Sequence, residues 1–108
     1  MKTILILGGY GQTGRLLANT LLDETECRLM LAGRRPERGA ALAAALNARA
    51  GQERVTTAQA DAADLDGLVC ALAGVDLVVV ASSTAAHGET VARAALAAGC
   101  DYLDIQYA

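Results

Sequence analysis

The residues best suited to chemistry form a glycine-rich turn near the start of the chain, directly behind the apolar run Thr3–Leu7: Gly8, Gly9, Tyr10, Gly11, Gln12, Thr13 and Gly14. Between a buried strand and a helix, such a turn presents backbone N–H groups and the positive end of the helix dipole to a pyrophosphate. Gly11 lets the phosphates approach the main chain, and Gly14 lets the helix pack close to the strand. Glycine at position 8 or at position 9 permits the tight turn, and both spacings stay open. We therefore expect residues 8–14 to bind a dinucleotide.

A pair of arginines stands where an acidic residue would indicate NAD. In NAD-type sites a carboxylate about 20 residues beyond the glycines accepts hydrogen bonds from the adenosine ribose. Here that position falls within Gly33, Arg34 and Arg35, which include no carboxylate. A guanidinium holds a 2′-phosphate bidentately and stacks on adenine. The sequence therefore predicts NADP(H), with Arg34 as the first candidate, Arg35 as the second and Arg38 as a more distant one. The alternative is that these arginines are solvated loop charges.

Two further loops supply candidate cofactor contacts. Asp61 follows a predicted strand and is suited to accept a hydrogen bond from the adenine amino group, while Ala62 packs near the ring; the alternative for Asp61 is a turn or capping role. Ser82 and Ser83 follow another strand and are suited to donate to the ribose or the phosphates. The next residue, Thr84, is equally suited to cap the last helix.

No general acid or base is evident, so the catalytic residues stay unknown. The lone histidine, His87, has no carboxylate or cysteine partner at a useful spacing. The only lysine, Lys2, precedes the first strand and lies at the wrong end of the predicted sheet. The three cysteines are odd in number and lack CxxC spacing, which favours structural thiols in a reducing compartment and predicts no metal site.

The elements that must position these residues alternate between strand and helix along the chain. Apolar runs predict five strands: Thr3–Leu7, Arg28–Ala32, Val55–Gln59, Leu77–Ala81 and Tyr102–Ile105. Helical periodicity predicts helices at Gln12–Leu22 and Ala86–Ala98. Two more helices are predicted between them, one that starts at Pro36 and ends near Gly51, and one that starts after the N-cap Asp64 and ends near Gly74. This alternation predicts an α/β fold, a Rossmann-like doubly wound parallel five-stranded sheet of order 3-2-1-4-5 with helices on both faces. Ligands bind such sheets where the strand order reverses, at the carboxyl ends of the strands.

Composition limits the partners. The 108 residues suffice for one domain with one core, and no apolar stretch approaches the ~20 residues that cross a bilayer. The formal net charge of −3 and the absence of Phe and Trp argue against binding nucleic acid. We therefore expect a cytoplasmic protein with no membrane or nucleic-acid partner.

Together these segments resemble the NADP-binding domain of saccharopine dehydrogenase-like oxidoreductases. The resemblance rests on residues 4–11 with Gly14-Arg15, on Ala32-Gly33-Arg34, and on the later segments 75–79 and 98–104. It implies a Rossmann domain with the pyrophosphate at Gly8–Thr13 and the 2′-phosphate near Arg34. Family members often carry a Pro-containing segment after the fourth strand, where this chain has Ser82-Ser83-Thr84.

The resemblance also implies a second domain that supplies substrate contacts and catalytic groups. We therefore expect residues 1–108 to be the N-terminal part of a longer oxidoreductase that transfers hydride to or from a small-molecule substrate, and to be inactive alone. One alternative is a stand-alone dinucleotide-sensing regulatory module. Another is an S-adenosylmethionine-binding fold, against which the missing acid after the second strand argues. We also expect the last strand, at a sheet edge, to pair or pack with another copy of the chain.

Overall fold

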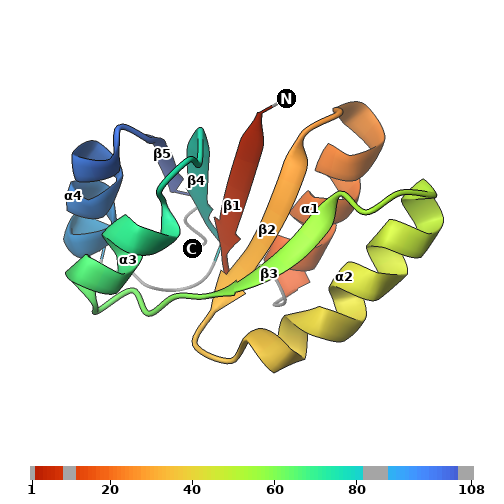
Figure 1. Cartoon of the computed structure of the whole chain (residues 1–108), viewed down its shortest axis with the longest axis horizontal. Helices are drawn as coiled ribbons and strands as arrows, with labels where there is room; N and C mark the ends of the chain where they lie inside the picture. Colours follow the sequence, from red (N-terminus) through yellow and green to blue (C-terminus); the bar gives the residue numbers. More distant parts are fainter. Residues whose placement is uncertain (1, 9–11, 82–87, 105–108) are drawn as a thin grey trace.

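The computed structural model describes residues 2–8, 12–81 and 88–104, which form one sheet flanked by helices (Figure 1). In chain order the elements are β1 (Thr3–Leu7), α1 (Gln12–Glu24), β2 (Arg28–Gly33), α2 (Pro36–Ala50), β3 (Val55–Gln59), α3 (Leu65–Ala71), β4 (Leu77–Val80), α4 (Gly88–Ala98) and β5 (Asp101–Asp104).

The sheet has the predicted topology. All four strand pairs are parallel, and the order is β3-β2-β1-β4-β5. The chain therefore winds outward from β1 through β2 to β3, crosses the sheet, and winds outward again through β4 to β5. The reversal lies between β1 and β4, whose carboxyl ends are neighbours because Leu7 is paired with Val80. The predicted Rossmann-like fold is confirmed.

Two core layers explain why the central strands are apolar at every position. Side chains alternate across a strand, so Ile4 and Ile6 pack into one layer while Leu5 and Leu7 pack into the other. The layer with Ile4 and Ile6 also contains Ala18 of α1 and Leu46 of α2. The opposite layer is closed by α3 and α4, which lie on the other side of the sheet from α1 and α2 (Figure 1). Burial on both faces requires an uninterrupted apolar run.

The predicted start and end of α2 and the predicted start of α3 are confirmed. Pro36 stands in the first turn of α2, where a missing N–H costs nothing, and Gly51 ends the helix in the left-handed region with φ +73°. Asp64 caps α3, because its Oδ1 accepts a hydrogen bond from the Gly67 N–H at 3.1 Å. The helix itself ends at Ala71, three residues before the predicted stop at Gly74, which has φ +80°.

Helix α1 runs two residues beyond its predicted end at Leu22. Neither glycine nor proline stops it there, and its last turn is closed by Thr25, whose backbone N–H and hydroxyl both donate to the Leu21 carbonyl, at 2.9 and 2.7 Å. A threonine that donates to a carbonyl of the preceding turn has no distinctive sequence pattern. The sequence therefore predicted the end of this helix two residues too early.

The remaining boundaries shift by single residues. β2 includes Gly33, and β5 starts at Asp101 rather than Tyr102. β4 ends at Val80, although the Ala81 N–H continues the ladder by donating to the Leu7 carbonyl at 2.9 Å. The predicted start of the last helix at residues 86–87 and the predicted strand end at residue 105 lie outside the described residues.

Candidate functional site

The candidate site lies at the carboxyl edge of the sheet, and its first described residue is Gly8, directly after β1. Gly8 has φ +85°, a conformation that glycine adopts without the steric cost of a side chain. Its N–H donates to the Ala32 carbonyl of β2 at 2.8 Å. The chain therefore leaves the β1–β2 ladder at this residue, as the tight turn predicted at position 8 or 9 requires. Gly9, Tyr10 and Gly11 lie outside the described residues.

Helix α1 then starts next to this turn with its N-terminus toward the carboxyl edge. Gly14 is buried in its first turn, and Thr13 is half-buried. Burial of Gly14 agrees with its predicted role, because a side chain there would separate the helix from the strand it packs against. Gln12 is the first helical residue. The N-terminal N–H groups of a helix lack intrahelical partners, so this end favours an anion.

The end of β2 carries the predicted basic residues. Gly33 is buried, and its carbonyl accepts a hydrogen bond from the Ala60 N–H at 2.9 Å. Arg34 and Arg35 follow at once and are both exposed. Arg35 occupies the N-cap position of α2 without a side-chain capping bond. Among the described residues, Arg34 makes no ion pair, so its guanidinium is available to an anion at this edge.

Asp61 and Ala62 lie beyond β3, at the same edge. The Oδ1 atom of Asp61 accepts a hydrogen bond from the Ala63 N–H at 2.9 Å, and its backbone carbonyl accepts one from the Asp64 N–H at 3.0 Å. Asp61 is thus a turn-forming residue, the alternative left open by the sequence. Ala62 is buried in the core layer closed by α3 and α4. Contacts of either residue with adenine stay a prediction.

The edge is completed at β4, which ends beside β1. Ala81 is buried, and its N–H donates to the Leu7 carbonyl at 2.9 Å. The predicted contacts at Ser82 and Ser83, together with Thr84 and His87, fall on residues outside the described part of the chain. The structure therefore brings Gly8, Gly14 and the Arg34–Arg35 pair to one edge and leaves the serines untested.

Comparison with known proteins decides the family. The family model for the saccharopine dehydrogenase NADP binding domain matches residues 4–108. The chain belongs to this family. The NADP(H) prediction and the predicted resemblance are thereby confirmed at the level of the domain. None of the curated proteins matches this chain in sequence.

Solved structures share the fold of this saccharopine dehydrogenase-type domain. Apo saccharopine dehydrogenase (L-Glu forming) from Saccharomyces cerevisiae is 23% identical with a TM-score of 0.75, over 100% of this chain and 22% of that one. A wide-type short-chain dehydrogenase/reductase from Veillonella parvula in complex with NADP is 24% identical with a TM-score of 0.78, and the match covers 99% of this chain and 48% of that one. An NADPH-dependent quinone oxidoreductase from Escherichia coli is 31% identical with a TM-score of 0.68, and the match covers 90% of this chain and 32% of that one. The chain spans less than half the length of each.

The residues at the carboxyl edge of this NADP binding domain fit the cofactor that its family name states. A 2′-phosphate is a dianion that needs positive hydrogen-bond donors and no carboxylate against it. The positions directly after β2 supply two guanidinium groups, and buried Gly33 precedes them. The α1 N-terminus and the turn at Gly8 supply an adjoining place for the pyrophosphate. The donor set thus suits the phosphorylated dinucleotide.

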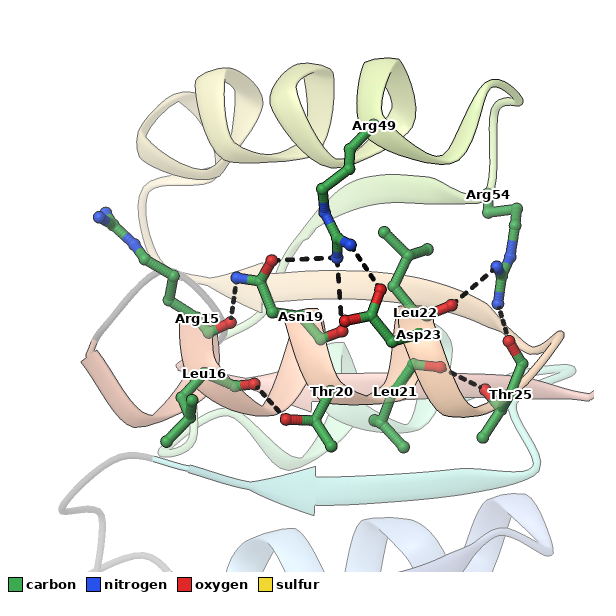
Figure 2. A network of polar contacts seen from close by, with 10 residues as sticks. All are labelled: Arg15, Leu16, Asn19, Thr20, Leu21, Leu22, Asp23, Thr25, Arg49 and Arg54. Carbon is green, nitrogen blue, oxygen red and sulfur yellow. Dashed lines mark hydrogen bonds and ion pairs between the residues drawn. The ribbon is translucent and has the colours of Figure 1, made fainter.

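A buried arginine that no sequence pattern indicated, Arg54, anchors the C-terminal end of α1. The Arg54 side chain is 9% exposed and donates to three backbone carbonyls: Leu22 at 3.1 Å, Thr25 at 2.6 Å, and Cys27 at 3.2 Å from Nε and 3.0 Å from Nη2. Figure 2 shows it reaching from the start of β3 to the C-terminal turn of α1. A cation there satisfies carbonyls that lack helical partners and faces the negative end of the helix dipole.

A second arginine, Arg49, ties α2 to α1 on the surface. It forms an ion pair with Asp23 and donates to the Asn19 side-chain oxygen at 3.1 Å (Figure 2). The two charged side chains are 44% and 57% exposed, so the pair is worth at most about 1 kcal/mol. These contacts show which faces of α1 and α2 are opposed.

Burial raises the pKa of the Cys100 thiol, and the nearby Asp101 and Asp76 carboxylates add to the effect. Cys100 lies before β5, at the amino edge and away from the candidate site, and its raised pKa disfavours the nucleophilic thiolate. Within residues 2–8, 12–81 and 88–104, no group of three or more His, Cys, Asp or Glu side chains could hold a metal ion.

Proposed function

We propose that this chain holds NADP(H) at the carboxyl edge of its sheet for hydride transfer to or from a small-molecule substrate. The observation that supports this most strongly is the Arg34–Arg35 pair at the end of β2, where an NAD site would carry an acid. Family membership over residues 4–108 favours the same cofactor. It also speaks against the S-adenosylmethionine alternative.

Each predicted site residue has a role in this proposal. Residues 8–14 hold the pyrophosphate through backbone N–H groups, and Arg34 with Arg35 holds the 2′-phosphate beside Gly33. Asp61 and Ala62 border the adenine, and Ser82 with Ser83 contacts the ribose or the phosphates. When bound, the nicotinamide supplies the hydride; the chain's part is to bind and orient the dinucleotide.

The catalytic groups belong, in this proposal, to a further domain of a longer oxidoreductase. The coverage of the neighbours supports it, because the chain spans only 22% of the yeast saccharopine dehydrogenase and 32% of the quinone oxidoreductase. The domain alone is then expected to bind cofactor without turnover.

We propose a cytoplasmic location and self-association through β5. No helix in the described part of the chain is long and apolar enough to cross a membrane. β5 is an edge strand that pairs with β4 on one side, and Leu103 on it is 50% exposed. An exposed strand edge with an apolar side chain is suited to pair or pack with a second copy.

Amide NMR spectra with added NADPH test the proposed site. The amide signals of Gly8, Thr13 and Arg34 are expected to move, because these residues border the cofactor at the carboxyl edge. Signals of Arg28 and Asp76, at the amino edge, are expected to stay. Larger shifts at Arg28 and Asp76 than at Gly8, Thr13 and Arg34 would contradict the proposed placement.

A further inference from the structure

One side of α1 contacts α2 through Asn19 and Asp23. Arg15, Asn19 and Asp23 follow one another at intervals of four residues, so their side chains share a face of the helix. Asn19 and Asp23 both contact Arg49 of α2, which shows that this face is the one opposed to α2 (Figure 2). Arg15 is therefore the member of the row nearest the N-terminus of α1, at the carboxyl edge of the sheet.

The opposing side of α2 also ends in an arginine. Arg38 precedes Arg49 by 11 residues, about three helical turns, so the two point from the same side of α2. Because Arg49 faces α1, Arg38 faces it too, roughly 16 Å nearer the N-terminus of α2. Both helices follow strands of one parallel sheet, so their N-termini lie at the same edge. Arg15 and Arg38 thus flank the loop that carries Arg34 and Arg35.

The charges around this position are unbalanced. Arg15 and Arg38 are exposed, and neither makes an ion pair within the described residues. Figure 2 shows the Arg15 guanidinium extended away from Asn19 and the Arg49 cluster. Two exposed carboxylates, Glu37 and Asp61, also lie toward this edge. Glu37 belongs to the outward side of α2 with Ala41 and Ala44, and Asp61 is engaged with the Ala63 N–H. Arg15, Arg34 and Arg38 therefore lie at one end of the α1–α2 interface, and none of the three forms an ion pair within the described residues.

We infer that Arg15 is a specificity-determining residue for the 2′-phosphate, which it contacts from the α1 side while Arg34 contacts it from the end of β2. This inference rests on the proposed NADP(H) site. Like charges gathered in this way repel one another, and a bound dianion relieves the repulsion while accepting their hydrogen bonds. Arg38 completes the cluster from α2.

Calorimetric titrations of Arg15→Gln with NADPH, NADH and adenosine 2′,5′-bisphosphate test the inference. We expect the dissociation constants for NADPH and for the bisphosphate to rise about tenfold, the loss of one charge-assisted hydrogen bond, while that for NADH stays within twofold. Arg28→Gln, with the same change of charge at the amino edge, is the matched control and is expected to bind all three ligands as the unaltered chain does. Because Arg15 is exposed, the variant is expected to melt at an unchanged Tm.

The possible outcomes separate this inference from the proposed function. Equal losses for NADPH and NADH would place Arg15 against the pyrophosphate and overturn the 2′-phosphate assignment, and unchanged affinity for NADPH would overturn it as well. In both cases the unaltered chain still binds NADPH, so the proposed function stands. If the unaltered chain binds neither dinucleotide, the proposed function fails and this inference fails with it.

Discussion

Replacing Arg54 by methionine is expected to lower the free energy of unfolding by about 3 kcal/mol. Methionine keeps most of the length and apolar stem of the side chain but removes the donors that now serve the Leu22, Thr25 and Cys27 carbonyls. These carbonyls stay next to a buried side chain, where a lost partner is not fully replaced by water. Urea unfolding followed by circular dichroism measures the loss as a lower midpoint at constant slope.

Arg49→Gln is the matched control for this experiment. Arg49 also binds α1, through Asp23 and Asn19, but from an exposed position. Its replacement is expected to cost less than about 1 kcal/mol, because solvent screens the ion pair. If the two variants lose equal stability, Arg54 is not the anchor of α1 and burial of its guanidinium does not matter.

Arg34→Ala is expected to weaken NADPH binding by about 1–3 kcal/mol, the range for a hydrogen bond to a charged group. The affinity for NADH is expected to change little, because NADH has no 2′-phosphate for the guanidinium to hold. Titration of the variant with both dinucleotides gives the two losses separately. Because Arg34 is exposed, the substitution is expected to leave the folding stability unchanged.

The same substitution at Arg28 supplies the control for Arg34. Arg28 is also exposed and starts the same strand, at the opposite edge of the sheet. Arg28→Ala is expected to leave both affinities unchanged. An equal loss of NADPH and NADH affinity in Arg34→Ala would remove the 2′-phosphate role and return this arginine to a solvated loop charge.

The fold was predictable because its determinants are local and agree with one another. The apolar run of β1, the glycine after it, Pro36 at the start of α2 and Asp64 before α3 each specify one step of the strand–helix alternation. Parallel strands joined by short helical connections leave few topologies, of which order 3-2-1-4-5 is the one observed. The placement of Gly8 and Arg34 at one edge follows from the parallel pairing of β1 with β2.

Contacts between residues distant in the chain were not predictable. The sequence next to Arg54 does not indicate that its side chain donates hydrogen bonds to carbonyls 27 to 32 residues earlier. These contacts form only because β3 lies beside β2. Which sides of α1 and α2 face each other likewise depends on the rotation of the two helices, which the Arg49 contacts with Asn19 and Asp23 reveal. Asp61 illustrates a different limit, because one aspartate after a strand suits both a ligand contact and a turn.

The most direct test of the account is the affinity of the unaltered chain for NADPH relative to NADH and S-adenosylmethionine, measured by calorimetry at one ionic strength. With arginines at the end of β2 in place of an acid, NADPH is expected to bind at least about tenfold more tightly than NADH, and S-adenosylmethionine not at all. Equal affinity for NADPH and NADH, or tight binding of S-adenosylmethionine without NADPH, would contradict the account.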